Sequence, residues 1–327
     1  MSNLMRAERL TKYYYPKNDL RFWARQPVKA VDDLSFSIAE GESFGLVGES
    51  GCGKSTVGRL LLRLSERTEG NVYYKDTDLY SLSNKRMKNL RVKLQPIFQD
   101  ADNSLDPRYT VARLLAEPFK RYPGTQGGQR GQRDNDPRIS QLLELVNLGS
   151  ELLERHPHEL SGGQRQRVGL ARALALEPEF IVADEPAASL DLSVQAQVLD
   201  LLKTRQEQKG IGLLYISHNL RIVRVMTQRM AVMYLGKFLE VGDTESIFRN
   251  PLHPYTKLLI SSLPILDPSK RKSKLDLAVS EPPNPFALPQ GCRFHPRCPD
   301  CQPICEVETP KLLPIGEGRS LACHLIR

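Results

Sequence analysis

The chain has 327 residues and a mass of 37.0 kDa, enough for one large domain with a smaller appendage. Its composition, 40% hydrophobic and 26% charged, is typical of a globular protein, and no apolar run approaches the roughly 18 residues of a membrane span. The first residues lack the apolar stretch of a secretory signal. The net charge of +8 is compatible with nucleic acid, with anionic lipid headgroups or with no specific partner, so charge alone identifies none.

Residues 1 to 47 are predicted to form short strands and turns. Three consecutive tyrosines, Tyr13 to Tyr15, precede the first buried strands. An exposed aromatic ring can stack on a nucleotide base, although aromatic runs more often pack within a sheet. The segment therefore predicts either a base-stacking ring or a packed strand.

A glycine-rich segment lies between a predicted buried strand, residues 44–47, and a stretch with helical spacing, residues 57–64. It fits the pattern G-x-x-x-x-G-K-[ST], in which backbone N–H groups and a helix N-terminus cradle phosphates. The lysine of the pattern reaches the β- and γ-phosphates and the following hydroxyl binds Mg²⁺. The alternative is a glycine-rich turn without a ligand. The pattern predicts a nucleoside triphosphate site formed by Gly48, Glu49, Ser50, Gly51, Cys52, Gly53, Lys54, Ser55 and Thr56.

Strands and helices alternate along the rest of the chain. Residues 103–177 are predicted to be mostly helical around a polar, glycine-rich loop at 124–137. Strands are predicted at 31–38, 70–75, 94–98, 180–183, 213–217, 230–235 and 237–241. This alternation predicts an α/β core with a parallel sheet.

Polar residues follow several of these elements. Gln99 follows one strand, the pair Asp184-Glu185 ends another, and His218 ends a third. Ser161 is a predicted N-cap in Leu160-Ser-Gly-Gly-Gln164. Carboxylates at the carboxyl end of a buried parallel strand are typical of an active site.

The order of these motifs resembles that of ATP-binding cassette (ABC) ATPases, over roughly residues 5 to 260. The resemblance implies a P-loop NTPase domain at 1–260 with a RecA-like core, an antiparallel β subdomain and a helical subdomain at about 103–177. Asn219 departs from the family, which usually has an aspartate after the histidine. Asp191 resembles the family's contact between protomers.

The resemblance also implies a role for each residue of the site. Ser55 and Gln99 would ligate Mg²⁺, and Asp184 would support the metal through water. Glu185 would polarise the attacking water, and His218 would contact the γ-phosphate. Ser161 and Gly163 would complete the ATP site of a second cassette. Tyr14 is the predicted adenine stack, with Tyr15 as the alternative.

A narrower resemblance rests on residues 47–56, on Asn250-Pro-Leu-His-Pro-Tyr-Thr256 and on a cysteine-rich tail. These segments resemble the ATPase subunits of oligopeptide, dipeptide and nickel importers. The resemblance implies three kinds of partner: two transmembrane permease subunits, a second ABC ATPase and an extracytoplasmic solute-binding protein. It implies no nucleic-acid partner. It also implies a peripheral position on the cytoplasmic face of the inner membrane. A soluble cassette ATPase acting on ribosomes or nucleic acid, and an exporter ATPase, are the alternatives.

The tail, residues 261–327, reads as a proline-rich linker and a cysteine-rich extension. Four of its cysteines have the spacing C-x₅-C-x₆-C-x₁₇-C, which differs from the paired C-x₂-C of a zinc ribbon. Four thiolates can hold zinc or an iron–sulfur cluster, and spacing does not decide between them; free buried thiols are the third possibility. The resemblance implies a [4Fe-4S] cluster on Cys292, Cys298, Cys305 and Cys323, with Cys301 as an additional cysteine.

Overall fold

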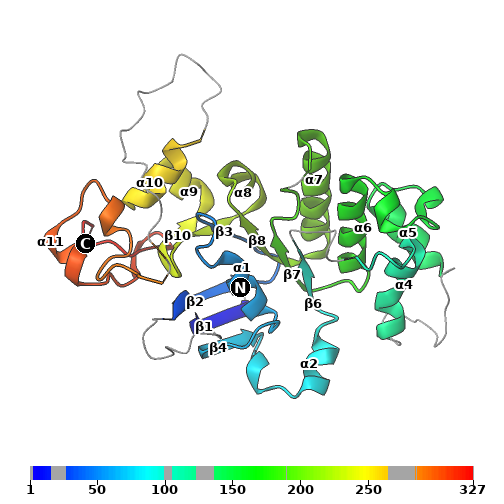
Figure 1. The fold of residues 1–327 in the computed structure, drawn as a ribbon, viewed down its shortest axis with the longest axis horizontal. Coiled ribbons are helices and arrows are strands. Elements are labelled where there is room, and N and C mark those ends of the chain that lie inside the picture. The colour runs from blue at the N-terminus through cyan, green and yellow to red at the C-terminus, as the bar shows by residue number, and fades with distance from the viewer. Residues whose placement is uncertain are drawn as a thin grey trace, which may run out of the picture. The chain divides into compact units, whose positions relative to one another are not determined.

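The computed structural model describes residues 3–15, 27–98, 105–122, 136–188, 190–263, 284 and 286–326 (Figure 1). The chain divides into two compact units. The first holds residues 1–4, 38–42 and 77–214, and the second holds residues 5–37, 43–76 and 215–327. Gln99, nearly all of the loop at 124–137 and residues 264–283 lie outside the described residues.

Most of the residues of three N-terminal strands belong to the second unit. These strands are β1 (Asn3–Tyr14), β2 (Val28–Ala39) and β4 (Glu69–Tyr74), in the order β2-β1-β4. β1 and β4 are antiparallel, and their register shifts between Glu8 and Thr11. Alternating buried and half-buried positions along β1 show a sheet with one face packed on the core.

A second sheet of this unit carries the candidate phosphate loop. The strands of this sheet that belong to the second unit are β3 (Ser43–Val47), β9 (Arg229–Tyr234), β10 (Lys237–Asp243), β12 (Arg319–Leu321) and β11 (Leu313–Gly316), in the order β11-β12-β10-β9-β3. β3 and β9 are parallel, whereas β10 is antiparallel to both of its neighbours. All five residues of β3 are buried, as expected for a strand covered on both faces.

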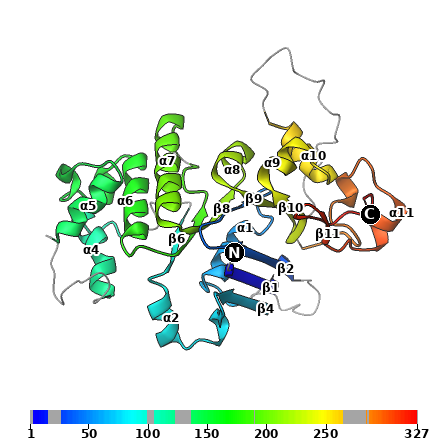
Figure 2. The same cartoon turned by 180° about the vertical axis from the view of Figure 1, so that it is seen from behind.

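The described part of the second unit also contains six helical segments. They are α1 (Lys54–Leu61), α8 (Leu220–Met226), α9 (Thr244–Arg249), α10 (Pro254–Ser261), the 3₁₀ turn His295–Arg297 and α11 (Pro303–Val307). Figures 1 and 2 both show the C-terminal segment, coloured orange to red, beside α10 and β10. The cysteine-rich tail is thus packed on the cassette, and its last two strands extend the sheet.

The first unit combines parallel strands with a group of helices. β6 (Leu94–Ile97) and β7 (Phe180–Asp184) are parallel neighbours. The first half of β8 (Gly212–Ser217) also belongs to this unit and pairs with the edge of β7 that faces away from β6. The helices α4 (Val111–Arg121), α5 (Pro137–Leu145) and α6 (Gly162–Leu174) pack against one another, as the green helices of Figure 1 show. The remaining elements are β5 (Thr77–Asp78), α2 (Asn84–Leu90), α7 (Leu192–Lys209) and the 3₁₀ turns Leu79–Ser81, Ser150–Leu152 and Pro157–Glu159.

Most of the secondary structure predicted from the sequence is confirmed. All the strands predicted from residue 31 onward are present, with ends within three residues of those predicted, and the described parts of residues 105–177 are largely helical. The strands β11 and β12 were not predicted, because the tail was expected to consist of loops. Within the described part of the chain, no helix is both long and apolar enough to span a membrane.

Candidate functional site

The phosphate loop connects β3 to α1, and two of its glycines are required by their surroundings. Gly48 and Gly53 have φ values of 153° and 111°. A Cβ on Gly48 would lie 2.1 Å from the Met233 carbonyl oxygen, and one on Gly53 would lie 1.9 Å from that of Ala30. Both contacts are with backbone, which cannot yield, so only glycine fits. Ser55 and Thr56 follow in the first turn of α1, both half-buried.

Lys54 is the first residue of α1 and points back over the loop. Its side chain is buried, and its Nζ donates hydrogen bonds to the carbonyl oxygens of Gly48 (2.8 Å) and Glu49 (2.9 Å). The Sγ of Cys52 lies 3.8 Å from the same nitrogen, and burial raises the pKa of this thiol. The loop therefore already surrounds the ammonium group that the sequence assigns to the β- and γ-phosphates.

The three consecutive tyrosines differ in what their side chains contact. The Tyr13 hydroxyl donates to Asp32 at 2.6 Å, and burial, reinforced by this bond, raises the pKa of Tyr13. Tyr14 and Tyr15 are exposed to 42% and 58%. Lys12 Nζ lies 5.0 Å from the centre of the Tyr14 ring, a cation–π contact. Tyr13 is thus a structural residue, and the two remaining rings have exposed surface for a ligand.

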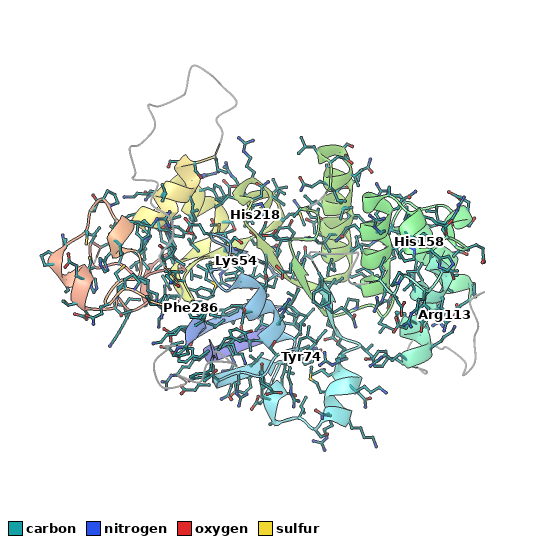
Figure 3. The ribbon with its side chains drawn as sticks, in the orientation of Figure 1. Lys54, Tyr74, Arg113, His158, His218 and Phe286 are labelled. Atoms are coloured by element: carbon teal, nitrogen blue, oxygen red, sulfur yellow. The ribbon has the colours of Figure 1, made fainter. Side chains whose placement is uncertain are left out.

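His218 follows β8 in the second unit and is exposed; Figure 3 labels it together with Lys54. The next residue, Asn219, caps α8 by accepting a hydrogen bond from the Arg221 N–H at 3.1 Å. Capping explains the departure at this position, because Asn and Asp are equivalent as N-cap residues.

Asp184 and Glu185 belong to the first unit, at the carboxyl end of β7. Both are half-buried, whereas the preceding residues Phe180 to Ala183 are buried. Glu185 has a φ of 47°, in the left-handed region that non-glycine residues rarely adopt. Such a conformation costs about 1–3 kcal/mol and is concentrated at active sites.

Ser161 and Gly163 lie at the start of α6, also in the first unit. The Ser161 hydroxyl accepts from the Gln164 N–H (3.2 Å), and the Gln164 side chain accepts from the Ser161 N–H (2.9 Å), which completes a capping box. A Cβ on Gly163 would lie 2.6 Å from Val194 of α7, so the glycine permits close approach of the two helices. Asp191 caps α7 by accepting from the N–H groups of Ser193 and Val194.

The five tail cysteines lie close enough to influence one another. Burial, followed by the nearby thiols of Cys305 and Cys323, raises the pKa of Cys292 to about 11. Burial also raises the pKa of Cys298 to about 11, with Cys292 and Cys323 among the contributing groups. Cys301 is exposed, unlike these four.

The arrangement of these thiols bears on whether they can hold a metal. Among the described residues, no group of three or more His, Cys, Asp or Glu side chains is placed to hold a metal ion. A single zinc would draw four sulfurs to within about 4 Å of one another. A four-iron cluster is larger and has iron at each corner, so its ligands stand further apart. The four thiols are therefore neighbours, but among the described residues they do not form a ready metal site.

Three buried arginines of the tail, which the sequence analysis missed, each bind a carboxylate of the cassette. Arg293 pairs with Asp32 and also donates to the Leu235 carbonyl. The other two pairs are Arg297 with Glu49 and Arg319 with Glu240. A signal was present in the sequence, since Arg293 directly follows Cys292 and Arg297 directly precedes Cys298.

Two family models match the chain. Residues 31–188 match the ABC transporter model, and residues 239–305 match the C-terminal region of oligopeptide/dipeptide transporters. The second match contains the segment from Asn250 to Thr256 and three of the four candidate cysteine ligands.

Curated relatives match over nearly the whole chain. The oligopeptide transport ATP-binding protein AppF of Bacillus subtilis is 43% identical over 96% of this chain and 95% of its own length. The dipeptide transport ATP-binding protein DppF of Haemophilus influenzae is 41% identical over 99% of this chain and 97% of its own length. The oligopeptide transport ATP-binding protein OppF of Salmonella typhimurium is 41% identical over 92% of this chain and 90% of its own length. The ribosome and nucleic-acid alternative receives no support from these relatives.

Solved structures share the cassette fold. The ATP-binding cassette MJ0796, in a dimeric post-hydrolysis state bound to ADP and Pi, has a TM-score of 0.64 and 28% identity and covers 73% of this chain and 98% of its own. CbiO1 from Clostridium perfringens has a TM-score of 0.62 and 23% identity, and the match covers 76% of this chain and 92% of the CbiO1 chain. At this identity it shows the fold alone. From the family models and the relatives together, the chain belongs to the ABC transporter family, as an ATPase among the oligopeptide and dipeptide transport ATP-binding proteins.

Proposed function

We propose that this ATPase drives a multi-subunit importer for di- or oligopeptides or a related small solute. The observation that carries the proposal is the agreement of peptide-transport relatives along more than 90% of the chain, including the C-terminal region. Its partners would be two transmembrane permease subunits, a second ABC ATPase and an extracytoplasmic solute-binding protein. The chain would lie peripherally on the cytoplasmic face of the inner membrane.

The proposed nucleotide site assigns a separate part of the bound nucleotide to each group of residues. Lys54 and the loop from Gly48 to Thr56 bind the phosphates of ATP, and Tyr14 stacks on the adenine, with Tyr15 as the alternative. Ser55, Gln99 and Asp184 supply the oxygen ligands or water contacts that Mg²⁺ prefers. When bound, Mg²⁺ neutralises charge on the β- and γ-phosphates.

Hydrolysis requires a water positioned against the γ-phosphate. Glu185 accepts a proton from that water as the general base, and His218 holds the γ-phosphate end of the nucleotide. Ser161 and Gly163 face the ATP of a second cassette, so two chains form the complete pair of sites. Residues 1–260 form the nucleotide-binding domain, with the helical subdomain at about 103–177, and residues 261–327 form the appended linker and extension.

The proposed import function is tested with the intact assembly. The tagged chain, purified from membranes of its source cells, should co-purify with two hydrophobic membrane subunits. In proteoliposomes, ATP hydrolysis should rise several-fold when the solute-binding protein and a peptide mixture are present. Co-purification with ribosomes or nucleic acid, and with no membrane subunit, would contradict the proposal.

We also propose that Cys292, Cys298, Cys305 and Cys323 hold one [4Fe-4S] cluster, supported by the electrostatic influence of these thiols on one another. The raised pKa values of Cys292 and Cys298 mean that these thiols are protonated without metal, and that cluster binding releases their protons. ATP hydrolysis transfers no electrons, so the cluster would stabilise the fold of the extension.

Anaerobically purified protein should be brown and contain about four irons per chain. Serine at any of the four positions should lower the iron content, because serine does not replace a thiolate ligand well. The matched control is Cys301→Ser, which changes an exposed thiol of the same segment and should keep the iron. Stoichiometric zinc without visible absorption would contradict the iron assignment, and iron loss in Cys301→Ser would contradict the choice of ligands.

A further inference from the structure

Glu49 places a carboxylate inside a loop whose other groups attract anions. It lies between Gly48 and Ser50, and Lys54 donates to its backbone carbonyl at 2.9 Å. A carboxylate that turned toward the loop would repel the phosphates and compete with them for the Lys54 ammonium group. High ATP affinity therefore requires that this carboxylate be neutralised and held aside.

Arg297 of the C-terminal extension makes this contact. Its Nη1 lies 2.9 Å from Glu49 Oε2 and 3.3 Å from the Tyr234 hydroxyl. The Arg297 side chain is 8% exposed and that of Glu49 is 26% exposed. Low exposure reduces solvent screening, and a second hydrogen bond to Tyr234 restricts the guanidinium to one place.

The Arg297 guanidinium also lies near two aromatic rings, 5.8 Å from the centre of Tyr234 and 5.9 Å from that of Phe294. Phe294, one turn earlier, is fully buried, with ring centroids 5.4 Å from Tyr234 and 5.3 Å from Tyr255. The Tyr255 hydroxyl in turn accepts a hydrogen bond from the Glu49 N–H at 3.0 Å. Glu49 is thus held at both its carboxylate and its amide by residues 248 and 206 positions later in the chain.

His253, two residues before Tyr255, holds the backbone of that tyrosine. His253 Nδ1 accepts from the Tyr255 N–H at 3.0 Å, and its ring contacts Phe294 edge-on. Burial, with Lys257 nearby, lowers the pKa of His253 to about 3, so the ring is neutral and Nδ1 can accept this bond. The segment 253–255 therefore connects the extension to the phosphate loop.

We propose that Arg297 is a positioning residue for the phosphate loop: by binding the Glu49 carboxylate, it keeps that charge away from the nucleotide and so sets the affinity for ATP. The contact joins the extension to the loop directly, and both lie in the same unit of the chain. The inference rests on the proposed role of the loop in binding ATP phosphates.

The test measures equilibrium binding of a fluorescent ATP analogue to the full-length chain. Arg297→Met keeps an apolar stem against the rings but removes the charge, and should weaken ATP binding about tenfold. Adding Glu49→Gln to this variant removes the unpaired carboxylate and should recover most of the affinity, although the ion pair is still missing. Arg297→Lys, which retains the charge, should stay within about threefold of wild type.

The control is Arg224→Gln, which breaks an exposed ion pair with Glu245 in the same unit and should leave affinity unchanged. Equal affinity of Arg297→Met and wild type overturns the inference. So does a double variant that binds as weakly as Arg297→Met, because the arginine would then serve packing alone. If Arg297→Met does not fold, Arg297→Lys and the double variant decide the question. A tenfold lower affinity for the ATP analogue than that of the wild type, in either of these two variants, overturns the inference.

The same measurements separate this inference from the proposed function. A wild-type chain that binds no ATP overturns both. A wild-type chain that binds ATP with the affinity of Arg297→Met leaves the proposed function intact and removes only the role of Arg297.

Discussion

Replacement of Glu185 by glutamine should slow ATP hydrolysis by a factor of about 100 to 10,000, while ATP binding stays near the wild-type level. The change keeps the size of the side chain and its place after β7 but removes the carboxylate that accepts the proton of the attacking water. Because the γ-phosphate is bound by other residues, the ground-state complex should form normally. Steady-state hydrolysis by the assembled transporter and separate nucleotide binding provide the two measurements.

Glu179→Gln is the matched control for this experiment. Glu179 directly precedes β7, at the opposite end of the strand from Glu185, and pairs with Lys93 at 2.7 Å. Its loss should leave turnover unchanged within about twofold, since a partly exposed ion pair contributes little to the fold. Near-wild-type turnover in Glu185→Gln would show that this residue is not the general base.

Glu240→Gln should lower the free energy of unfolding of the sheet that holds the phosphate loop by about 3–5 kcal/mol. Glu240 is fully buried and accepts hydrogen bonds from the N–H groups of Leu252 (3.2 Å) and His253 (3.0 Å). It also pairs with Arg319, whose side chain is 8% exposed. An amide leaves the arginine as an uncompensated buried charge, which is more costly than the loss of one bond.

Urea denaturation should show this loss, and hydrogen–deuterium exchange should locate it in β10 and β12. The comparison is Glu245→Gln, where the carboxylate is exposed and bound by Arg224 through two bonds of 2.8 and 2.9 Å. This variant should unfold like the wild type, because solvent screens the pair. Equal stability of the Glu240 and Glu245 variants would refute the argument from burial.

The parts of the fold that were predictable from the sequence are those encoded locally. The continuous apolar run Phe180–Ala183 identifies a buried strand, and the spacing of Gly48, Gly53 and Lys54 identifies the phosphate loop. The capping box at Ser161 is likewise local. In each case the residues that determine the structure are neighbours in the chain, so their spacing is sufficient.

The attachment of the tail was not predictable in this way. Arg293 and Asp32 are 261 positions apart, and Arg297 and Glu49 are 248 positions apart. Periodicity carries no information at such separations, and β12 has only three residues, too few to show an alternating pattern. The choice between Tyr14 and Tyr15 as the adenine-stacking ring stays a prediction, because both side chains are exposed.

The placement of β12 against β10 bears on how the sheet avoids association with other chains. Phe238, Leu239 and Val241 make β10 an apolar strand, and an open edge of this kind is a template for pairing between copies. β12 covers that edge, and β11, which then becomes the edge, is only four residues long and contains Pro314. A cassette cut before residue 284 would expose β10 to water, and its first failure would be aggregation, ahead of any defect in catalysis.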